Sequence, residues 1–210
     1  MKKVLSAMLA LGLIFCSCSK KVTPSISLAN NSASFTCNGG TVKVPVSSNC
    51  SWVADCEAED VMIAPASYNG DCNVSVTVPP TQSETTESVR VTFTASNGES
   101  TATAKFVATV QARPFIKIPQ SASTVTVPST DCGVKINIEC NDEWEYVYSS
   151  ANKTLTVSPQ SGFGSQEVSV SFPASTVTRD KQFNLTFRLK NDTSESVVIK
   201  FKQMKKGSTL

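Results

Sequence analysis

Histidine is absent from this 210-residue chain, and its absence excludes much ordinary enzyme chemistry. Histidine is the usual general base, the usual partner of a serine or cysteine nucleophile, and the commonest zinc ligand. Two facing carboxylates can still hydrolyse a glycoside. The acidic residues available for this form two clusters, Asp55, Glu57, Glu59 and Asp60 in one and Asp142, Glu143 and Glu145 in the other. Both lie near expected loops, where solvated charge is the ordinary explanation, so we expect no catalytic residue and no cofactor.

Residues 55–60 also supply the oxygen atoms that Ca²⁺ takes as ligands. The segment lacks the ligand spacing of a known calcium loop. We therefore expect no metal site.

Six cysteines could form structural disulfides if the chain is exported. They are Cys37, Cys50, Cys56, Cys72, Cys132 and Cys140. Cys132 and Cys140 flank an extended run that places their Cα atoms about 26 Å apart, whereas a bridge spans about 4.4 to 6.8 Å. That bridge would need the strand to fold back, and the same reasoning disfavours Cys37 with Cys50. We expect Cys50 with Cys56 and Cys37 with Cys72, although four cysteines leave other pairings open.

The first residues have the parts of a bacterial export signal. Lys2 and Lys3 form a positive n-region, residues 5–15 are apolar, and cysteines follow at once. A signal peptidase needs a small residue before its cut, and Ser17 satisfies this for Cys18. The similarity to bacterial lipoproteins implies a lipid on Cys18. The alternative is a plain secretory signal that is cut elsewhere.

We therefore expect a signal peptide at 1–17 and a lipidated linker at 18–23, with the lipid as the link to a membrane. Removing Lys2 and Lys3 leaves 17 basic against 17 acidic residues, so we expect no nucleic-acid partner. Surface-exposed bacterial lipoproteins resemble one another in an acidic stretch soon after the lipidated cysteine, whereas here Ser19-Lys20-Lys21 follows Cys18. This favours an outer-membrane lipoprotein that faces the periplasm over one at the cell surface.

The mature chain repeats itself after about ninety residues, which indicates two copies of one unit. The repeat is carried by an alternating run followed by asparagine and tryptophan, with Asn49 and Trp52 recurring as Asn141 and Trp144. Further on, the positions that correspond are Pro65 with Pro159, Gly70 with Gly164, Val74 with Val168 and Gln111 with Gln203. The small drift in offset is typical of loop insertions.

Apolar and polar residues alternate within each copy, as at Val42, Val44 and Val46. A period of two places such residues on one face of a β-strand. Turn-forming stretches such as Asn69-Gly70-Asp71 separate the runs at spacings usual for all-β sandwiches. We expect an all-β protein with two tandem immunoglobulin-like β-sandwich domains, at 24–112 and 113–204, and a C-terminal tail at 205–210.

Each copy resembles a BACON domain, an immunoglobulin-like module of Bacteroidetes that often accompanies carbohydrate-active enzymes. The matching features are the segments ending in Trp52 and Trp144, the stretch at 157–164, Arg179 before a strand, and the terminal strands at Gln111 and Gln203. The family's second tryptophan is replaced by Met62 and Leu155, and Arg179 has Thr85 as its counterpart. The resemblance implies a tandem sandwich and a carbohydrate-associated role as a binding module or a spacer.

Sugar rings stack on exposed aromatic rings, so the aromatic residues are the candidate ligand contacts. Trp52 and Trp144 recur at one place in both copies, which favours a position in the core. The second copy adds Tyr146 and Tyr148, spaced two apart, while Phe163 and Tyr68 lie in expected loops. We therefore expect ligand contacts at Tyr146, Tyr148 and Phe163. The function expected is a non-catalytic envelope lipoprotein that binds a glycan or acts as a spacer, and the alternative is a structural or protein-interaction subunit of an envelope assembly.

Overall fold

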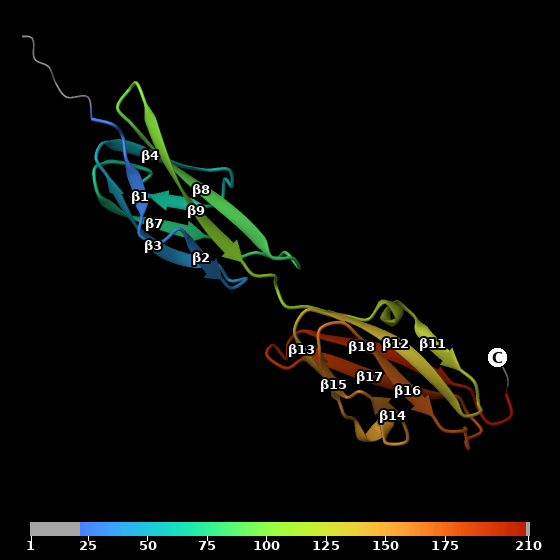
Figure 1. Ribbon diagram of the computed structural model, residues 1–210. Coiled ribbons are helices and arrows are strands. Elements are labelled where there is room, and N and C mark those ends of the chain that lie inside the picture. The colour runs from blue at the N-terminus through green and yellow to red at the C-terminus, as the bar shows by residue number, and fades with distance from the viewer. Residues whose placement is uncertain (1–21, 209–210) are drawn as a thin grey trace, which may run out of the picture. The chain divides into compact units, whose positions relative to one another are not determined.

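The chain forms two β-sandwiches in tandem in the computed structural model, which describes residues 22–208 (Figure 1). Strands β1–β9 build the first sandwich and strands β10–β18 build the second. Each sandwich has one four-stranded and one five-stranded sheet. The expected all-β architecture with two sandwiches is confirmed.

The first sandwich has the sheet orders β1-β3-β7-β5 and β2-β9-β8-β4-β6. Its strands are β1 (Ile26–Leu28), β2 (Ser32–Phe35), β3 (Gly40–Ser48), β4 (Ser51–Cys56), β5 (Met62–Ala64), β6 (Ser67–Asn69), β7 (Cys72–Val78), β8 (Glu87–Ser96) and β9 (Thr101–Val110). The short strands β5 and β6 each lie at the edge of a sheet.

The second sandwich repeats this arrangement strand for strand, with orders β10-β12-β16-β14 and β11-β18-β17-β13-β15. Its strands are β10 (Ile116–Lys117), β11 (Thr124–Val127), β12 (Cys132–Cys140), β13 (Glu143–Val147), β14 (Thr156–Ser158), β15 (Ser161–Phe163), β16 (Gln166–Phe172), β17 (Lys181–Leu189) and β18 (Ser196–Gln203). Strand β11 runs parallel to β18. Adding nine to each strand number of the first sandwich gives the order of the second, so the sequence repeat is a repeat of topology.

Two short 3₁₀ turns, η1 (Pro119–Ala122) and η2 (Ser150–Asn152), are the helical elements among residues 22–208. Within that range no helix is both long enough and apolar enough to cross a membrane.

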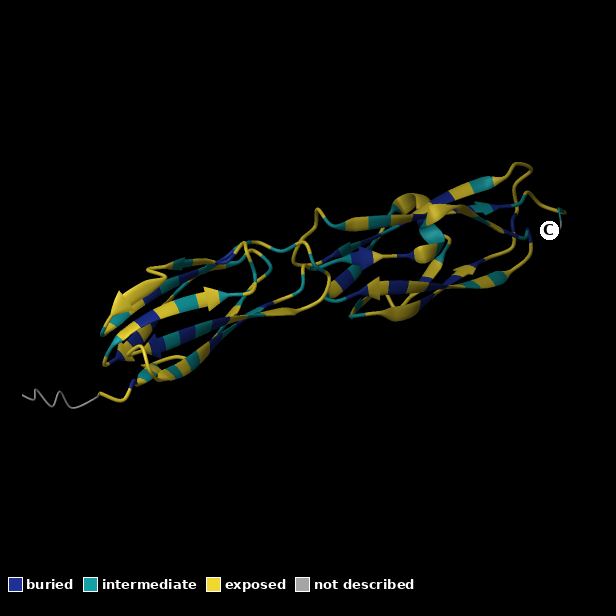
Figure 2. Cartoon of the chain, turned by 90° about the horizontal axis from the view of Figure 1, so that it is seen from above, coloured by how far each residue is buried: buried dark blue, intermediate teal, exposed yellow. Residues whose placement is uncertain are grey.

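Alternation of apolar and polar residues produces the two cores, as the banded strands in Figure 2 show. In β3, Val44 and Val46 are buried, whereas Lys43, which directly precedes Val44, is exposed. In β17, Phe183, Leu185, Phe187 and Leu189 are all buried. Burying a side chain of this size stabilises the fold by about 1.5 to 3 kcal/mol, so each sheet is held to its partner by its inward face.

Trp52 and Trp144 lie in the cores, 2% and 0% exposed, as their recurrence predicted. Each ring packs edge-on against a phenylalanine of the neighbouring strand, Trp52 against Phe93 and Trp144 against Phe187, at centroid distances of 5.7 and 6.0 Å. A buried indole N–H needs an acceptor. Trp52 Nε1 donates to the Gly70 carbonyl at 2.9 Å, and in the second sandwich the equivalent bond measures 3.0 Å.

The repeated glycines supply the carbonyl groups that accept these tryptophan hydrogen bonds. Gly70 and Gly164 have φ angles of +86° and +67°, a conformation that glycine adopts without steric cost. Each presents its carbonyl to a tryptophan, and each N–H donates to the chain that enters the tryptophan strand, at Cys50 and Asp142. The glycines recur because each sandwich has the same positive-φ turn, whose carbonyl accepts the hydrogen bond from the tryptophan.

The repeated asparagines tie down the first strand of each sandwich. Asn49 accepts a hydrogen bond from the Ser25 N–H at 2.8 Å and donates one to the Thr23 carbonyl at 2.8 Å. Asn141 makes the corresponding pair with Phe115 and Arg113 at 2.9 and 3.0 Å. The asparagine, tryptophan and glycine of the repeat are therefore structural.

The expected bridge between Cys50 and Cys56 is wrong. The described cysteines are free thiols. Strand β4 runs from the residue after Cys50 to Cys56 itself, so the two Cα atoms are about 20 Å apart in an extended chain. An extended strand likewise separates Cys132 from Cys140, because β12 runs without a break between them.

The expected bridge between Cys37 and Cys72 is wrong for a similar reason. The Cys37 carbonyl accepts a hydrogen bond from Thr81, which follows the C-terminal end of β7. Cys72 is the first residue of β7. The length of that strand, about 20 Å, therefore separates the two cysteines.

Cys140 takes the place that Ser48 occupies in the first sandwich. Ser48 Oγ donates to the Cys50 carbonyl at 2.9 Å and accepts from the same residue's N–H at 3.3 Å. Cys140 Sγ makes both contacts with Asp142, at 3.2 and 3.4 Å. Burial raises the pKa of the Cys140 thiol. This cysteine is a protonated, structural donor rather than a nucleophile.

We expect Cys140→Ser to unfold at nearly the urea concentration of the wild type, because Ser48 shows that a hydroxyl fits this position. Cys140→Ala leaves the Asp142 carbonyl and N–H without this partner, and we expect a loss of about 1 to 3 kcal/mol. Urea unfolding followed by circular dichroism measures both. Equal stability of the serine and alanine variants would contradict the assigned role.

Candidate functional site

A shallow hollow lies on the outer face of the five-stranded sheet of the first sandwich, over β4, β6 and β8. Its volume is about 390 Å³. The residues that line it are Ser51, Trp52, Val53, Ser67, Tyr68, Thr94 and Ser96. None of these residues is Asp, Glu, Lys, Arg or His, so the lining of the hollow contains no charged side chain.

Strand alternation explains how these side chains gather. Trp52 points into the core, so its neighbours Ser51 and Val53 point outward and are exposed. Val53 is paired with Ser67 on β6 and with Thr94 on β8, which places three small side chains in a row across the sheet. Val53 is 56% exposed and presents an apolar side chain between the hydroxyl groups of its neighbours.

Tyr68 forms the edge of the hollow. It lies on the edge strand β6, where its register partner is Trp52. Its ring therefore starts from the core-facing side of the sheet, yet 50% of the residue is exposed because no strand lies beyond β6. An exposed ring with a terminal hydroxyl offers both a stacking surface and a hydrogen bond.

The same face of the second sandwich is charged. Alignment on the tryptophans places Glu145 at the position of Val53, and its partner across the strands is Arg188 instead of Thr94. Arg188 binds Glu145 at 2.7 Å, and Lys190 lies 3.5 Å from Glu143. Two ion pairs thus lie at the positions where the hollow of the first sandwich has uncharged side chains.

Tyr146 was expected to be an exposed ligand contact, and this expectation is wrong. Its ring packs against the core and lies 5.5 Å from the ring of Phe187. Its hydroxyl accepts a hydrogen bond from the buried Asn152 at 3.3 Å, and the same amide group donates to the Asn184 carbonyl at 2.8 Å. Tyr146 shares the face of Trp144, as its spacing predicted, but that face is the inner one.

Tyr148 and Phe163 are both 67% exposed, but the structure does not bring them together. Phe163 on β15 is paired with Glu143, the first residue of β13. Tyr148 follows the last residue of β13, so about five residues of strand, or 16 Å, separate the two rings along the sheet. The three expected contacts therefore form no single platform.

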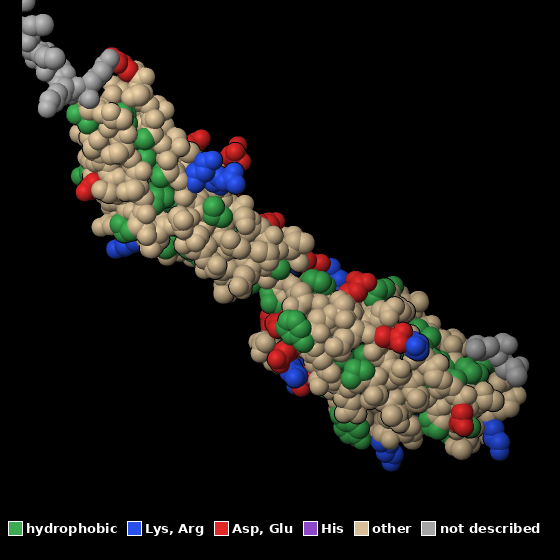
Figure 3. All heavy atoms as spheres, in the orientation of Figure 1, with side chains coloured by type: hydrophobic (Ala, Val, Ile, Leu, Met, Phe, Trp, Pro, Cys, Tyr) green, Lys and Arg blue, Asp and Glu red, His purple; other side chains and the backbone are tan. Residues whose placement is uncertain are grey.

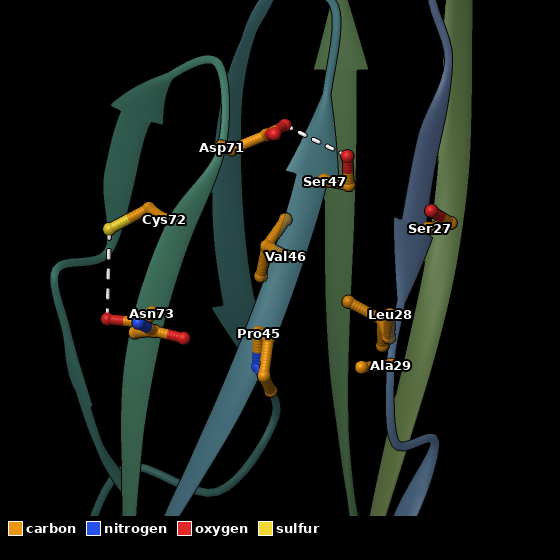
Figure 4. A pocket seen from close by; sticks show the side chains of 9 residues that line it. All are labelled: Ser27, Leu28, Ala29, Pro45, Val46, Ser47, Asp71, Cys72 and Asn73. Atoms are coloured by element: carbon orange, nitrogen blue, oxygen red, sulfur yellow. Dashed lines mark hydrogen bonds between the residues drawn. The ribbon is translucent and has the colours of Figure 1, made fainter.

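A second hollow, of about 430 Å³, lies on the other sheet of the first sandwich (Figure 4). Asp71 at its end accepts hydrogen bonds from the Ser47 hydroxyl and the Ser48 N–H, both at 2.8 Å. The hydrogen bond from the Ser48 N–H, and to a smaller extent the one from the Ser47 hydroxyl, holds the pKa of Asp71 below its ordinary value. In the second sandwich Ser165 accepts from the Cys140 N–H in the same way at 3.1 Å. The Asp71 carboxylate therefore serves a structural contact, and this hollow is the weaker candidate.

The acidic clusters do not gather as a metal-binding group in the part of the chain that the structure describes. Glu143 and Glu145 are engaged in ion pairs. Among residues 22–208, no three His, Cys, Asp or Glu side chains gather in a way that could hold a metal ion. Charged side chains of both signs lie scattered over the surfaces visible in Figure 3.

Sequence reasoning missed the hollow because its members lie on three strands. Ser51 and Thr94 carry no signal by themselves, and only the strand pairing joins them. A usable signal was present in the repeat: the aligned positions 53 and 145 are valine in one copy and glutamate in the other.

Known protein-family profiles contain no match to this chain. A search of curated proteins also found no match. Similarity appears among solved structures. The Protocadherin GammaB4 extracellular domain matches 87% of this chain at a TM-score of 0.58 and 10% identity, with 33% of that chain covered. Domains EC1-2 of human mucin-like protocadherin match 86% of this chain and 98% of their own, at a TM-score of 0.54 and 10% identity.

A Bacteroides ovatus GH5 xyloglucanase, solved with a XXXG heptasaccharide, matches 43% of this chain at 18% identity. Its TM-score of 0.37 is too low to support a conclusion about this chain. This chain spans about a third of the GammaB4 protocadherin structure and about a fifth of the xyloglucanase. The protocadherin matches show the fold alone: this is a tandem immunoglobulin-like β-sandwich protein.

Proposed function

We propose that this protein is a non-catalytic lipoprotein of the cell envelope whose first sandwich binds a glycan and whose second sandwich is a spacer. The observation that carries the proposal is the uncharged hollow over β4, β6 and β8. Its mixture of hydroxyl groups, one exposed valine and one half-exposed tyrosine matches the two chemistries of a sugar, which are hydroxyl groups on the rim of the ring and C–H groups on its faces.

The resemblance of each copy to a BACON domain supports the same proposal, because that family accompanies carbohydrate-active enzymes. The spacer role of the second sandwich is supported by its paired charges, Glu145 with Arg188 and Glu143 with Lys190, at the positions that are open in the first. These exposed ion pairs place charged groups where the first sandwich presents hydroxyl groups and a valine.

Affinity electrophoresis against plant, host and bacterial polysaccharides tests the proposal. We expect at least one polysaccharide to retard the mature protein. Tyr68→Ala should weaken this retardation roughly tenfold, since recognition aromatics commonly contribute more than about 1 kcal/mol. Tyr148→Ala is the matched control, because Tyr148 is also exposed but lies in the other sandwich.

The proposal fails if no polysaccharide in the panel retards the protein, or if Tyr148→Ala weakens retardation as much as Tyr68→Ala does. The first result would favour a structural or protein-interaction subunit of an envelope assembly.

The membrane anchor in this proposal is a lipid on Cys18, which lies outside the described residues. Labelling with an alkyne fatty acid should tag the wild type and Cys16→Ala but not Cys18→Ala, because only Cys18 has a small residue before it. Tagging of Cys18→Ala would refute the assignment. For an outer-membrane lipoprotein facing the periplasm, we expect protease added to intact cells to leave the protein uncut, and rapid loss would show the opposite orientation.

A further inference from the structure

We infer that the hollow of the first sandwich selects uncharged saccharides and rejects acidic ones, an inference that rests on the proposed glycan binding. The hollow is lined by no lysine or arginine. A carboxylate or sulfate entering it would lose part of its hydration without gaining an ion pair, which is unfavourable for a charged group. A sugar hydroxyl needs only a donor and an acceptor, and a serine or threonine hydroxyl is both.

The hydroxyl groups of the hollow are available for this purpose. Within the described residues, the side chains of Ser51, Ser67 and Thr94 form no hydrogen bond to another protein group, while Ser96 Oγ accepts one from the Gly98 N–H at 3.0 Å. Some side-chain hydroxyls elsewhere in this sandwich are engaged within the protein, as in the bond between Thr41 and Thr77 at 2.8 Å. The three unengaged hydroxyls surround the exposed Val53, because Ser67 and Thr94 are its register partners.

In the second sandwich, an ion pair occupies the positions equivalent to the middle of the hollow. At the two positions equivalent to Val53 and Thr94 this sandwich carries Glu145 and Arg188, which bind each other at 2.7 Å. In the second sandwich, the Arg188 guanidinium and the Glu145 carboxylate thus already have each other as hydrogen-bond partners. Transferring this pair to the first sandwich should therefore close the hollow, and the backbone register needed for the pair is already present.

The experiment compares neutral glucans, xylans and mannans with their carboxymethylated derivatives in affinity gels. We expect a neutral polysaccharide to retard the mature protein, and its carboxymethylated form to retard it at least about tenfold more weakly. The double variant Val53→Glu/Thr94→Arg should lose at least about tenfold in affinity for the neutral polymer. The reciprocal variant Glu145→Val/Arg188→Thr should bind like the wild type.

A second double variant, Ser51→Glu/Ser96→Lys, reproduces the ion pair between Glu143 and Lys190. It is used if thermal melts show that the first double variant does not fold. Equal retardation by neutral and carboxymethylated polymers, or full binding by a folded transfer variant, would overturn the inference and leave glycan binding intact. Absence of retardation by every polymer would overturn the proposed function itself.

Discussion

Replacing Trp144 by alanine is expected to destabilise the second sandwich by about 3 to 5 kcal/mol. The side chain is 0% exposed and is among the largest fully buried side chains of the molecule. Its loss leaves a cavity beside Phe187 and removes the donor to the Gly164 carbonyl. Both consequences act in the same direction.

The two tryptophans make this experiment selective. Without Trp144, the remaining tryptophan fluorescence comes from Trp52 and reports the first sandwich, while circular dichroism reports both. We expect a new early transition in circular dichroism during urea unfolding, with the fluorescence midpoint unchanged. Tyr148→Ala is the control on the same segment, and its midpoint should match the wild type because Tyr148 is 67% exposed. A Trp144→Ala variant as stable as that control would contradict the assigned core role.

Adding a single methyl group at Gly162 is expected to cost about 1 to 3 kcal/mol, the usual range for overpacking a filled site. A Cβ atom there would lie 2.8 Å from the Trp144 ring and would also overlap the end of the Gln166 side chain. The Gln166 end can move away, but the buried ring has little room to do so. Thermal melts of Gly162→Ala measure the cost.

Gly133→Ala is the matched control, since Gly133 also lies in a strand of the second sandwich and its added Cβ would meet nothing within 4 Å. We expect this variant to melt at or slightly above the wild-type temperature, because alanine loses less backbone freedom on folding than glycine. If both alanine variants melt alike, the close packing of Gly162 against Trp144 is not the reason for the glycine.

The fold could be predicted from the sequence because its determinants are local and occur twice. Alternating residues such as Val44 and Val46 define a strand and its inner face, and the recurrence of Trp52 as Trp144 locates the core. The structure adds the reason for the recurrence, which is the indole bond to a glycine carbonyl.

The candidate site could not be predicted in the same way, because it depends on which strands are neighbours. Tyr146 was correctly placed on the face of Trp144, but the sequence does not say that Asn152 would return to satisfy the tyrosine hydroxyl. Val53 and Thr94 are 41 positions apart, and only the pairing of β4 with β8 makes them adjacent. The disulfide expectation failed because the strand that separates Cys50 from Cys56 was not recognised as continuous.

Mapping of backbone amide NMR shifts during titration of the mature protein with a neutral oligosaccharide tests the location of binding most directly. We expect shifts concentrated at residues 51–53, 67–68 and 94–96, with the residues of β13 and β15 unchanged. Shifts concentrated instead around Tyr148 and Phe163, or none in the first sandwich with an oligosaccharide that the protein binds, would contradict it.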